Sequence, residues 1–221
     1  MAKKAASYGN DSISSLKGAD RVRKRPAVIF GSDGIEGCEH SIFEILSNSI
    51  DEAREGYGNV ITVTRYEDGS VEVEDHGRGC PVDYNKNEGR YNWELAFCEL
   101  YAGGKYKNNE AESYEYSLGL NGLGLCATQY ASEYMDVDIR RDGFRYTLHF
   151  ERGENVGGLH KEPYAKKDTG SKTSPKCFFM FHLFFLHDRS QCYAYISNTN
   201  LTSPCPISNI LEISKMEYPL S

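Results

Sequence analysis

Hydrophobic and polar positions alternate along the chain with two different periods, and each period predicts one type of element. Alternation at every second position, typical of half-buried strands, occupies residues 59–65, 70–74, 134–140 and 144–150. Asp68-Gly69 separates the first two segments and Arg141-Asp142-Gly143 the last two, which predicts two β-hairpins. Helical spacing occupies residues 39–55, 92–101 and 123–131. The chain is therefore expected to be α+β, a two-layer α/β sandwich with helices on one face of a mixed, mostly antiparallel sheet.

The predicted helix 39–55 has an apolar and a polar face. The apolar stripe consists of Ile42, Leu46, Ile50 and Ala53, with Phe43 beside it. The opposite stripe consists of Glu44, Asn48, Asp51 and Glu55. A carboxylate, an amide and a second carboxylate thus follow one another at i, i+4 and i+7 on one face. This is the pattern of a solvated helix face and also that of a polar site, and the helix alone does not distinguish the two.

A second candidate for chemistry is the end of the predicted hairpin, residues 74–81. Asp75 stands at the strand end and is followed by Gly77 and Gly79. Glycines at such positions permit a positive φ or a close approach of a ligand to the backbone. The arrangement suits a flat heterocycle whose exocyclic amine donates to the carboxylate, and it also suits a simple Asp-capped turn.

The third candidate is the glycine-rich segment 118–124, which precedes the predicted helix 123–131. Unpaired N–H groups and the positive end of a helix dipole hold phosphate at such a position. The segment is not a P-loop, because Leu125 follows its last glycine where that motif requires lysine. Lys105, in the upstream glycine-rich loop 102–106, is placed to reach a γ-phosphate.

Composition and charge exclude several classes of protein. The 221 residues are 39% hydrophobic and carry a net charge of -7, which disfavours a surface that binds phosphate backbones throughout. No apolar run approaches the length of a membrane span, and no leader sequence is visible, so no membrane association is expected. The seven cysteines contain no C-x-x-C pair, which indicates a reducing, cytoplasmic environment.

The composition changes near residue 173. No glycine follows Gly170, whereas residues 174–221 contain four of the seven prolines. Five of the ten phenylalanines lie within residues 177–185. One interpretation is a hydrophobic strand over residues 177–186 followed by a polar loop. The preferred interpretation is a terminal segment foreign to the domain, and the predicted organisation is an N-terminal arm (1–15), one domain (16–173) and an atypical tail (174–221).

The order of the motifs resembles one protein family. The matching segments are 16–18 (LKG), 22–26 (VRKRP), 43–53 (FEILSNSIDEA), 75–81 (DHGRGCP), 102–106 (AGGKY), 119–124 (GLNGLG) and 169–171 (TGS). Over about residues 10–173 the chain is similar to the ATPase domain of the B subunit of bacterial type II topoisomerases, DNA gyrase and topoisomerase IV, which belongs to the GHKL superfamily and has a Bergerat-type fold. The VRKRP and AGGK segments are specific to topoisomerases, whereas N-x-x-D-A also occurs in Hsp90-type chaperones, MutL-type ATPases and histidine kinases.

The resemblance implies ATP and Mg²⁺ as ligands and a role for each matching residue. Glu44 would be the general base that activates water, Asn48 the Mg²⁺ ligand, and Asp75 the acceptor of the adenine amine. The implied wall of the base pocket consists of Asp51, Glu52, Arg78, Gly79, Pro81 and Ser171, with Glu52 the partner of Arg78 and Ser171 acting through water. The implied phosphate clamp consists of Lys105, Tyr114, Gly119, Leu120, Asn121, Gly122, Leu123, Gly124 and Leu125.

Departures from the family pattern leave two functions open. Leu118 and Asn121 replace a glycine and a histidine of the lid motif, and residues from 174 on show neither the next strand nor the transducer lysine of the family. The first function is the ATP-hydrolysing domain of a topoisomerase B subunit, which couples ATP hydrolysis to DNA strand passage and supercoiling together with an A subunit, a second B subunit and DNA bound by further domains. The alternative is a truncated nucleotide-binding module with little or no turnover. The choice between gyrase and topoisomerase IV also stays open.

Overall fold

The computed structural model describes residues 15–66, 68–102 and 122–177, together with the backbone of residues 191–195 and 212–216. The helices are α1 (Asp20–Arg23), α2 (Pro26–Phe30), α3 (Ile35–Arg54), α4 (Asn92–Cys98) and α5 (Gly124–Ala131). The strands are β1 (Val60–Arg65), β2 (Val71–Asp75), β3 (Tyr84–Asn85), β4 (Arg90–Tyr91), β5 (Ser132–Arg141), β6 (Phe144–Glu151), β7 (Glu154–Pro163), β8 (Gly170–Cys177), β9 (Gln191–Tyr195) and β10 (Glu212–Met216). No helix in these ranges is long and apolar enough to cross a bilayer.

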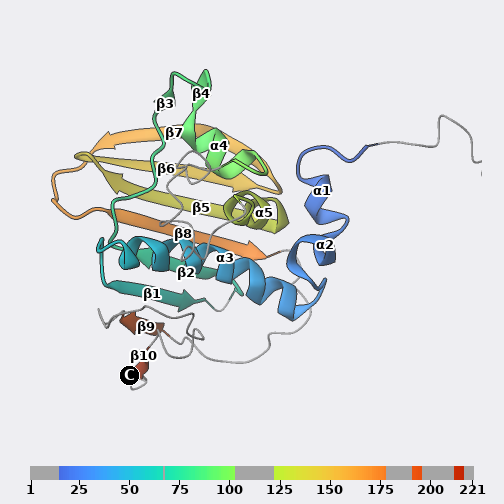
Figure 1. Cartoon of the computed structure of the whole chain (residues 1–221), viewed down its shortest axis with the longest axis horizontal. Helices are drawn as coiled ribbons and strands as arrows, with labels where there is room; N and C mark the ends of the chain where they lie inside the picture. Colours follow the sequence, from blue (N-terminus) through green and yellow to red (C-terminus); the bar gives the residue numbers. More distant parts are fainter. Residues whose placement is uncertain (1–14, 67, 103–121, 178–190, 196–211, 217–221) are drawn as a thin grey trace, which may run out of the picture.

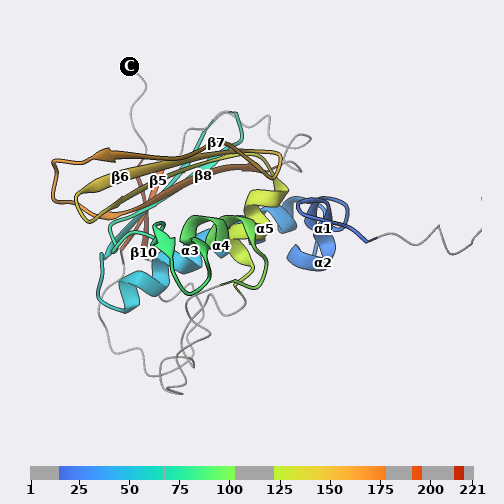
Figure 2. The ribbon, with the colours of Figure 1, turned by 90° about the horizontal axis from the view of Figure 1, so that it is seen from above.

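The large sheet has the strand order β10-β9-β1-β2-β8-β5-β6-β7, and each neighbouring pair described is antiparallel (Figure 1). Strand β8 lies between β2 and β5 although about 100 residues of sequence separate it from β2. Seen from above, the helices lie on one side of the sheet (Figure 2). The predicted α+β class, with a mostly antiparallel sheet and helices on one face, is confirmed.

Both predicted hairpins are present, and their turns have the conformations that glycine favours. Asp142 and Gly143 have φ of 54° and 77°, the two positive values that a type I′ turn between β5 and β6 requires. Gly69 has φ of 85° in the turn between β1 and β2, and Asp68 accepts hydrogen bonds from the backbone and hydroxyl of Ser70. The predicted bounds differ from the observed ones by up to four residues, because helix and strand ends depend on tertiary contacts.

Helix α3 packs on β1 and β2 through an apolar cluster. Its buried members are Ile45, Ile50, Ala53, Ile61 and Val73, with Ile42, Leu46, Val63 and Leu125 at the margin. The predicted stripe is corrected at two positions, because Ile45 lies in the core and Asp51, expected on the polar face, is only 7% exposed. The helix wheel is wrong there because other elements cover part of the polar face, so α3 is buried on more than one side.

The boundary expected at residue 173 falls inside β8. Residues 174–177 continue the ladder with β5, and Cys177 is paired with Ser132 and is 2% exposed. The expectation that no strand continues beyond residue 173 is therefore wrong for these four residues. Further along the chain, β9 pairs with β1 and β10 pairs with β9 in the same sheet. Every second residue of this part of β8 is buried, namely Thr173, Pro175 and Cys177. These small side chains do not form the hydrophobic alternation by which a strand is recognised in a sequence.

Candidate functional site

The Asp75 carboxylate, at the end of β2, joins three elements of the fold. Its Oδ1 accepts hydrogen bonds from the backbone N–H of Gly77 (2.9 Å) and from that of Ser171 in β8 (3.1 Å). Its Oδ2 accepts from the Ser49 hydroxyl of α3 (3.0 Å). The side chain is buried, with Asp75 7% and Ser49 4% exposed. A simple capped turn uses only neighbouring amides, so this arrangement goes beyond the Asp-capped turn considered for the sequence.

Burial raises the pKa of the Asp75 carboxyl, while the three hydrogen bonds oppose that rise. A carboxylate offers about four acceptor positions. Gly77 and Ser171 occupy both positions on Oδ1, and Ser49 occupies one on Oδ2. One acceptor position on Oδ2 is left for a ligand that donates a hydrogen bond.

The glycines around Asp75 are required by close packing of the protein against itself. Gly79 has φ of +78°, and a Cβ there would lie 2.8 Å from the Arg140 carbonyl oxygen. At Gly77 a Cβ would lie 3.1 Å from Glu52, and at Gly170 it would overlap the Asp75 carbonyl oxygen. A Thr169 hydroxyl also donates to the Gly77 carbonyl oxygen at 2.6 Å. These contacts hold the strand ends of β2 and β8 in one rigid corner.

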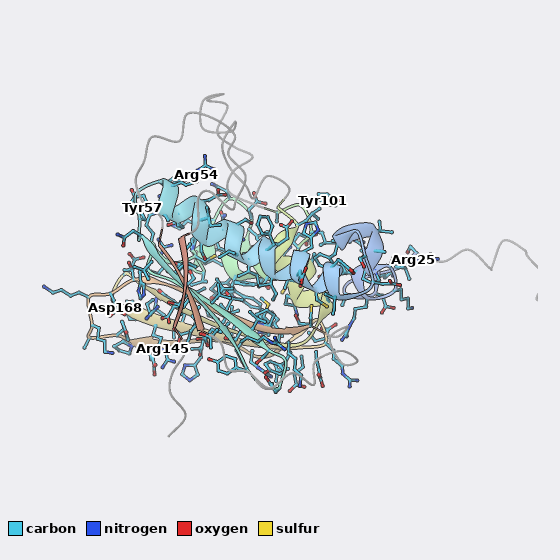
Figure 3. All side chains as sticks on the ribbon, turned by 90° about the horizontal axis from the view of Figure 1, so that it is seen from below. Arg25, Arg54, Tyr57, Tyr101, Arg145 and Asp168 are labelled. Carbon is cyan, nitrogen blue, oxygen red and sulfur yellow. The ribbon has the colours of Figure 1, made fainter. Side chains whose placement is uncertain are left out.

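The Arg78 guanidinium lies beside this corner and is held on several sides. Glu52, the partner predicted for it, accepts from Nε (3.0 Å), from Nη2 (2.6 Å) and from the Arg78 backbone N–H (3.1 Å). Glu55 accepts a further hydrogen bond, and the guanidinium lies 4.1 Å from the ring centroid of Tyr57. These carboxylates, Glu52 first, raise the pKa of Arg78 above its usual range. Arg54 and Tyr57 mark this end of α3 in Figure 3.

The other end of the site is formed by Glu44, earlier in α3. The His40 ring, one turn before it, contacts Glu44 Oε1 through Nε2 at 3.2 Å and the Phe30 carbonyl oxygen through Nδ1 at 3.2 Å. A carbonyl oxygen only accepts, so Nδ1 carries a proton and Nε2 faces the carboxylate. His40 is thus able to share a proton with Glu44.

Asn48 fits the role of a cation ligand that the resemblance implies. Its amide nitrogen donates to the Glu44 backbone carbonyl (2.9 Å), which directs the side-chain oxygen away from the helix backbone. Such an oxygen is a donor that Mg²⁺ accepts alongside phosphate and water. Within the described residues no group of three His, Cys, Asp or Glu side chains forms a metal site on its own. Of the described residues, Asn48 is the one to which the resemblance gives this role.

Glycine is also required where α5 begins. A Cβ at Gly124 would overlap Glu44 Oε2 and would lie 2.8 Å from Glu44 Cβ. The first turn of α5 therefore lies directly against the Glu44 side chain. Gly122, Leu123 and Leu125 belong to the described part of this segment, and Leu125 packs between two apolar clusters. Five of the predicted clamp residues lie outside the described residues: Lys105, Tyr114, Gly119, Leu120 and Asn121.

Three residues of the site, Ser49, His40 and Thr169, are not predicted from the sequence. His40 stands at i−4 from Glu44, a spacing that a helix brings together, so its contact was predictable in principle. Ser49 and Thr169 give no such signal, because their partners are 26 and 92 residues away. Of the predicted base-pocket residues, Pro81 is exposed, and the Ser171 hydroxyl accepts from the Cys80 backbone N–H at 3.1 Å.

Comparison with known proteins identifies the family. Residues 35–163 match the model of the histidine kinase-, DNA gyrase B-, and HSP90-like ATPases. The chain is 46% identical over 149 residues to the DNA gyrase B subunit of Thermotoga maritima, an alignment that covers 67% of this chain and 23% of that protein. It is 41% identical over 174 residues to the DNA topoisomerase 4 B subunit of Staphylococcus aureus, covering 78% of this chain and 26% of that protein. The chain thus spans about a quarter of the length of these relatives.

Two solved structures share the fold. One is the topoisomerase IV ATP-binding domain of Francisella tularensis in complex with a small-molecule inhibitor, with a TM-score of 0.59 at 34% identity over 72% of this chain and 41% of that one. The other is the 43K ATPase domain of Thermus thermophilus gyrase B in complex with an aminocoumarin, with a TM-score of 0.59 at 32% identity over 76% of this chain and 41% of that one.

Proposed function

The chain belongs to the family of histidine kinase-, DNA gyrase B- and HSP90-like ATPases, and from this premise we propose that it is the ATP-binding and ATP-hydrolysing domain of a type II topoisomerase B subunit. One observation carries the proposal: Asp75 and Ser49 of α3 form a buried, hydrogen-bonded acceptor site at one end of the site, and Glu44, a carboxylate beside His40 earlier in the same helix, lies at the other end. Glu44 and Glu52 are eight positions apart, which is about 12 Å along the helix. Base recognition and phosphate chemistry are thus arranged along one rigid element.

At the base end, the adenine amine donates to the open acceptor position of Asp75. The Ser171 hydroxyl, held by the Cys80 N–H, assists through a bridging water. Pro81, Gly79 and the Arg78 side chain line the pocket, and Asp51 supports the α3 side of it from its buried position.

At the phosphate end, Glu44 removes a proton from the attacking water, and the carboxylic acid so formed donates a hydrogen bond to His40 Nε2. Asn48 holds Mg²⁺, which when bound neutralises charge on the phosphate oxygens. The amides of residues 122–125 and the α5 N-terminus face the phosphates, and Lys105, Tyr114, Gly119, Leu120 and Asn121 complete the clamp.

In the whole protein, ATP turnover drives DNA strand passage and supercoiling. The partners proposed are a second B subunit, a topoisomerase A subunit and DNA bound by other domains, in the cytoplasm. These assignments rest on the similarity to gyrase and topoisomerase IV B subunits.

The test separates recognition from chemistry with two substitutions. Glu44→Ala is expected to leave the affinity for a non-hydrolysable ATP analogue within a few-fold and to reduce turnover by about 10²-fold or more, the usual cost of losing a general base. Asp75→Asn presents an N–H donor to the adenine amine, so affinity is expected to fall by about 1–3 kcal/mol. Calorimetric titration and a phosphate-release assay measure both quantities on each variant. Loss of binding in Glu44→Ala with intact binding in Asp75→Asn would falsify the assignment.

A further inference from the structure

The hydroxyl of Ser49 behaves differently from the other serine hydroxyls of α3. A serine inside a helix usually donates to a carbonyl of the preceding turn. Ser41 donates to the Cys38 carbonyl (2.7 Å) and Ser47 to the Glu44 carbonyl (2.9 Å), as expected. Ser49 instead donates across to Asp75 Oδ2 on another element, at 3.0 Å. All three serines are buried, so burial alone does not explain the difference.

The position of Ser49 determines which acceptor of Asp75 is left for a ligand. The two backbone N–H groups of Gly77 and Ser171 are fixed by the fold and fill Oδ1. Ser49 is the one side chain among the described residues that donates to Asp75, and it fills one of the two positions on Oδ2. The last acceptor position is therefore restricted to the one direction on Oδ2 that Ser49 does not use.

We infer that Ser49 is a specificity-determining residue, which positions the Asp75 carboxylate so that the site selects purine nucleotides carrying an amine at C6. The inference rests on the proposed function, because it takes Asp75 as the group that contacts the base. Ser49 does not touch the ligand and acts through Asp75. Without the Ser49 hydroxyl, both acceptor positions on Oδ2 are open to water. The C6 amine then competes with water for either position, so the carboxylate no longer offers it a single fixed acceptor.

The test compares two ligands on the full chain. One is a non-hydrolysable ATP analogue, and the other is the same triphosphate analogue built on purine riboside, which has hydrogen in place of the C6 amine. The dissociation constant of the ligand without the amine, divided by that of the ATP analogue, measures recognition of the amine. Effects on binding of the ribose and the phosphates cancel in this ratio. Ser49→Ala is expected to reduce this ratio about tenfold, the size of one hydrogen bond to a charged group. Affinity for the ligand without the amine is expected to stay within about twofold.

Ser47→Ala is the matched control, because Ser47 is on the same helix and 1% exposed and its hydroxyl bonds only within the helix. It is expected to leave the ratio unchanged. Alanine is the best helix former, so both variants are expected to fold. Equal losses for the two ligands in Ser49→Ala, or an unchanged or larger ratio, would overturn the inference.

Asp75→Asn distinguishes this inference from the function on which it rests. If Asp75→Asn abolishes the preference for the amine and Ser49→Ala retains it, the inference alone is wrong. If Asp75→Asn leaves the preference intact, the assignment of Asp75 to the base is wrong, and the role of Ser49 is overturned with it.

Discussion

The two ends of the candidate site are built by different kinds of contact. At the Asp75 end the hydrogen bonds join residues 26, 91, 92 and 96 positions apart in the sequence. At the Glu44 end, His40 and Asn48 make their hydrogen bonds to Glu44 within one turn of the same helix. The hydrogen bonds of the proposed base are thus local to one helix, although α5 packs against it, whereas the proposed recognition corner exists only when β2, α3 and β8 have come together.

The strongest test of this contrast is a pair of glycine substitutions. Gly79→Ala places a Cβ against backbone atoms of β5 and β8 at a φ of +78°, so the free energy of unfolding is expected to fall by about 2–4 kcal/mol. Gly124→Ala places a Cβ 2.8 Å from Glu44 Cβ, which the α3 backbone holds in place, so the free energy of unfolding is also expected to fall, by about 1–3 kcal/mol. Turnover of Gly124→Ala is expected to fall by about tenfold or more, since Glu44 must move. Urea unfolding and phosphate release measure the two effects.

Gly89→Ala is the control for the backbone penalty alone, because Gly89 has φ of +67° and no atom within 4 Å of its Cβ position. It is expected to cost about 1 kcal/mol. Equal destabilisation by Gly79→Ala and Gly89→Ala would show that the packing of the corner is not tight, and normal turnover in Gly124→Ala would show that α5 does not restrain Glu44.

Two truncations test the contribution of β8 to the recognition corner. Removal of everything after Thr173 deletes the ladder of residues 174–177 and the buried Cys177, so the melting temperature is expected to fall by about 4–8 °C and nucleotide affinity to drop. Removal of everything after Cys177 also deletes β9, which pairs with β1 at the edge of the sheet. Every hydrogen bond described for the site joins residues before Cys177, so nucleotide affinity is expected to change by less than about twofold in this longer truncated chain. Thermal unfolding with and without the ATP analogue checks both truncations. A large loss of affinity in the longer truncated chain would show that residues after Cys177 support the site.

The smallest effect is expected for the stability of Asp75→Asn without ligand. Burial raises the pKa of Asp75, so folding favours its protonated form, and the ionised form opposes folding. The variant is therefore expected to match the parent below the ordinary pKa of aspartate, near pH 3.9, and to be the more stable one above the raised pKa. Urea unfolding at several pH values measures this difference. A variant that is less stable than the parent at neutral pH would show that the three donors outweigh the burial.

The sequence predicts the elements well and the site in part. Periodicity identifies the two hairpins and the core helix, and the type I′ turn at Asp142-Gly143 follows from residue chemistry. Helical spacing places Glu44 and Asn48 on one face, while their roles follow from the resemblance and stay predictions. The Arg78–Glu52 pair is present as expected from the resemblance.

What the sequence does not predict depends on contacts between elements that are far apart in the sequence. The burial of Asp51 arises because other elements cover the face of α3 that a helix wheel treats as solvent-exposed. The role of Ser49 depends on Asp75, a partner 26 residues away on another element. The end of β8 was missed because Thr173, Pro175 and Cys177 are buried without being strongly hydrophobic. Residues of this kind become recognisable only through their partners in the sheet.

The contact between Gly170 and the Asp75 backbone has a consequence for the order of folding. Nearly a hundred residues must be closed into a loop before the Ser171 amide reaches Asp75. Contacts of such long sequence separation form slowly, because the entropy of loop closure is lost before any contact is gained. The corner that would hold the base is therefore among the last parts of the domain to assemble. A nascent chain that has not yet placed β8 in the sheet has no base pocket, so the nucleotide stabilises only chains that have completed the sheet.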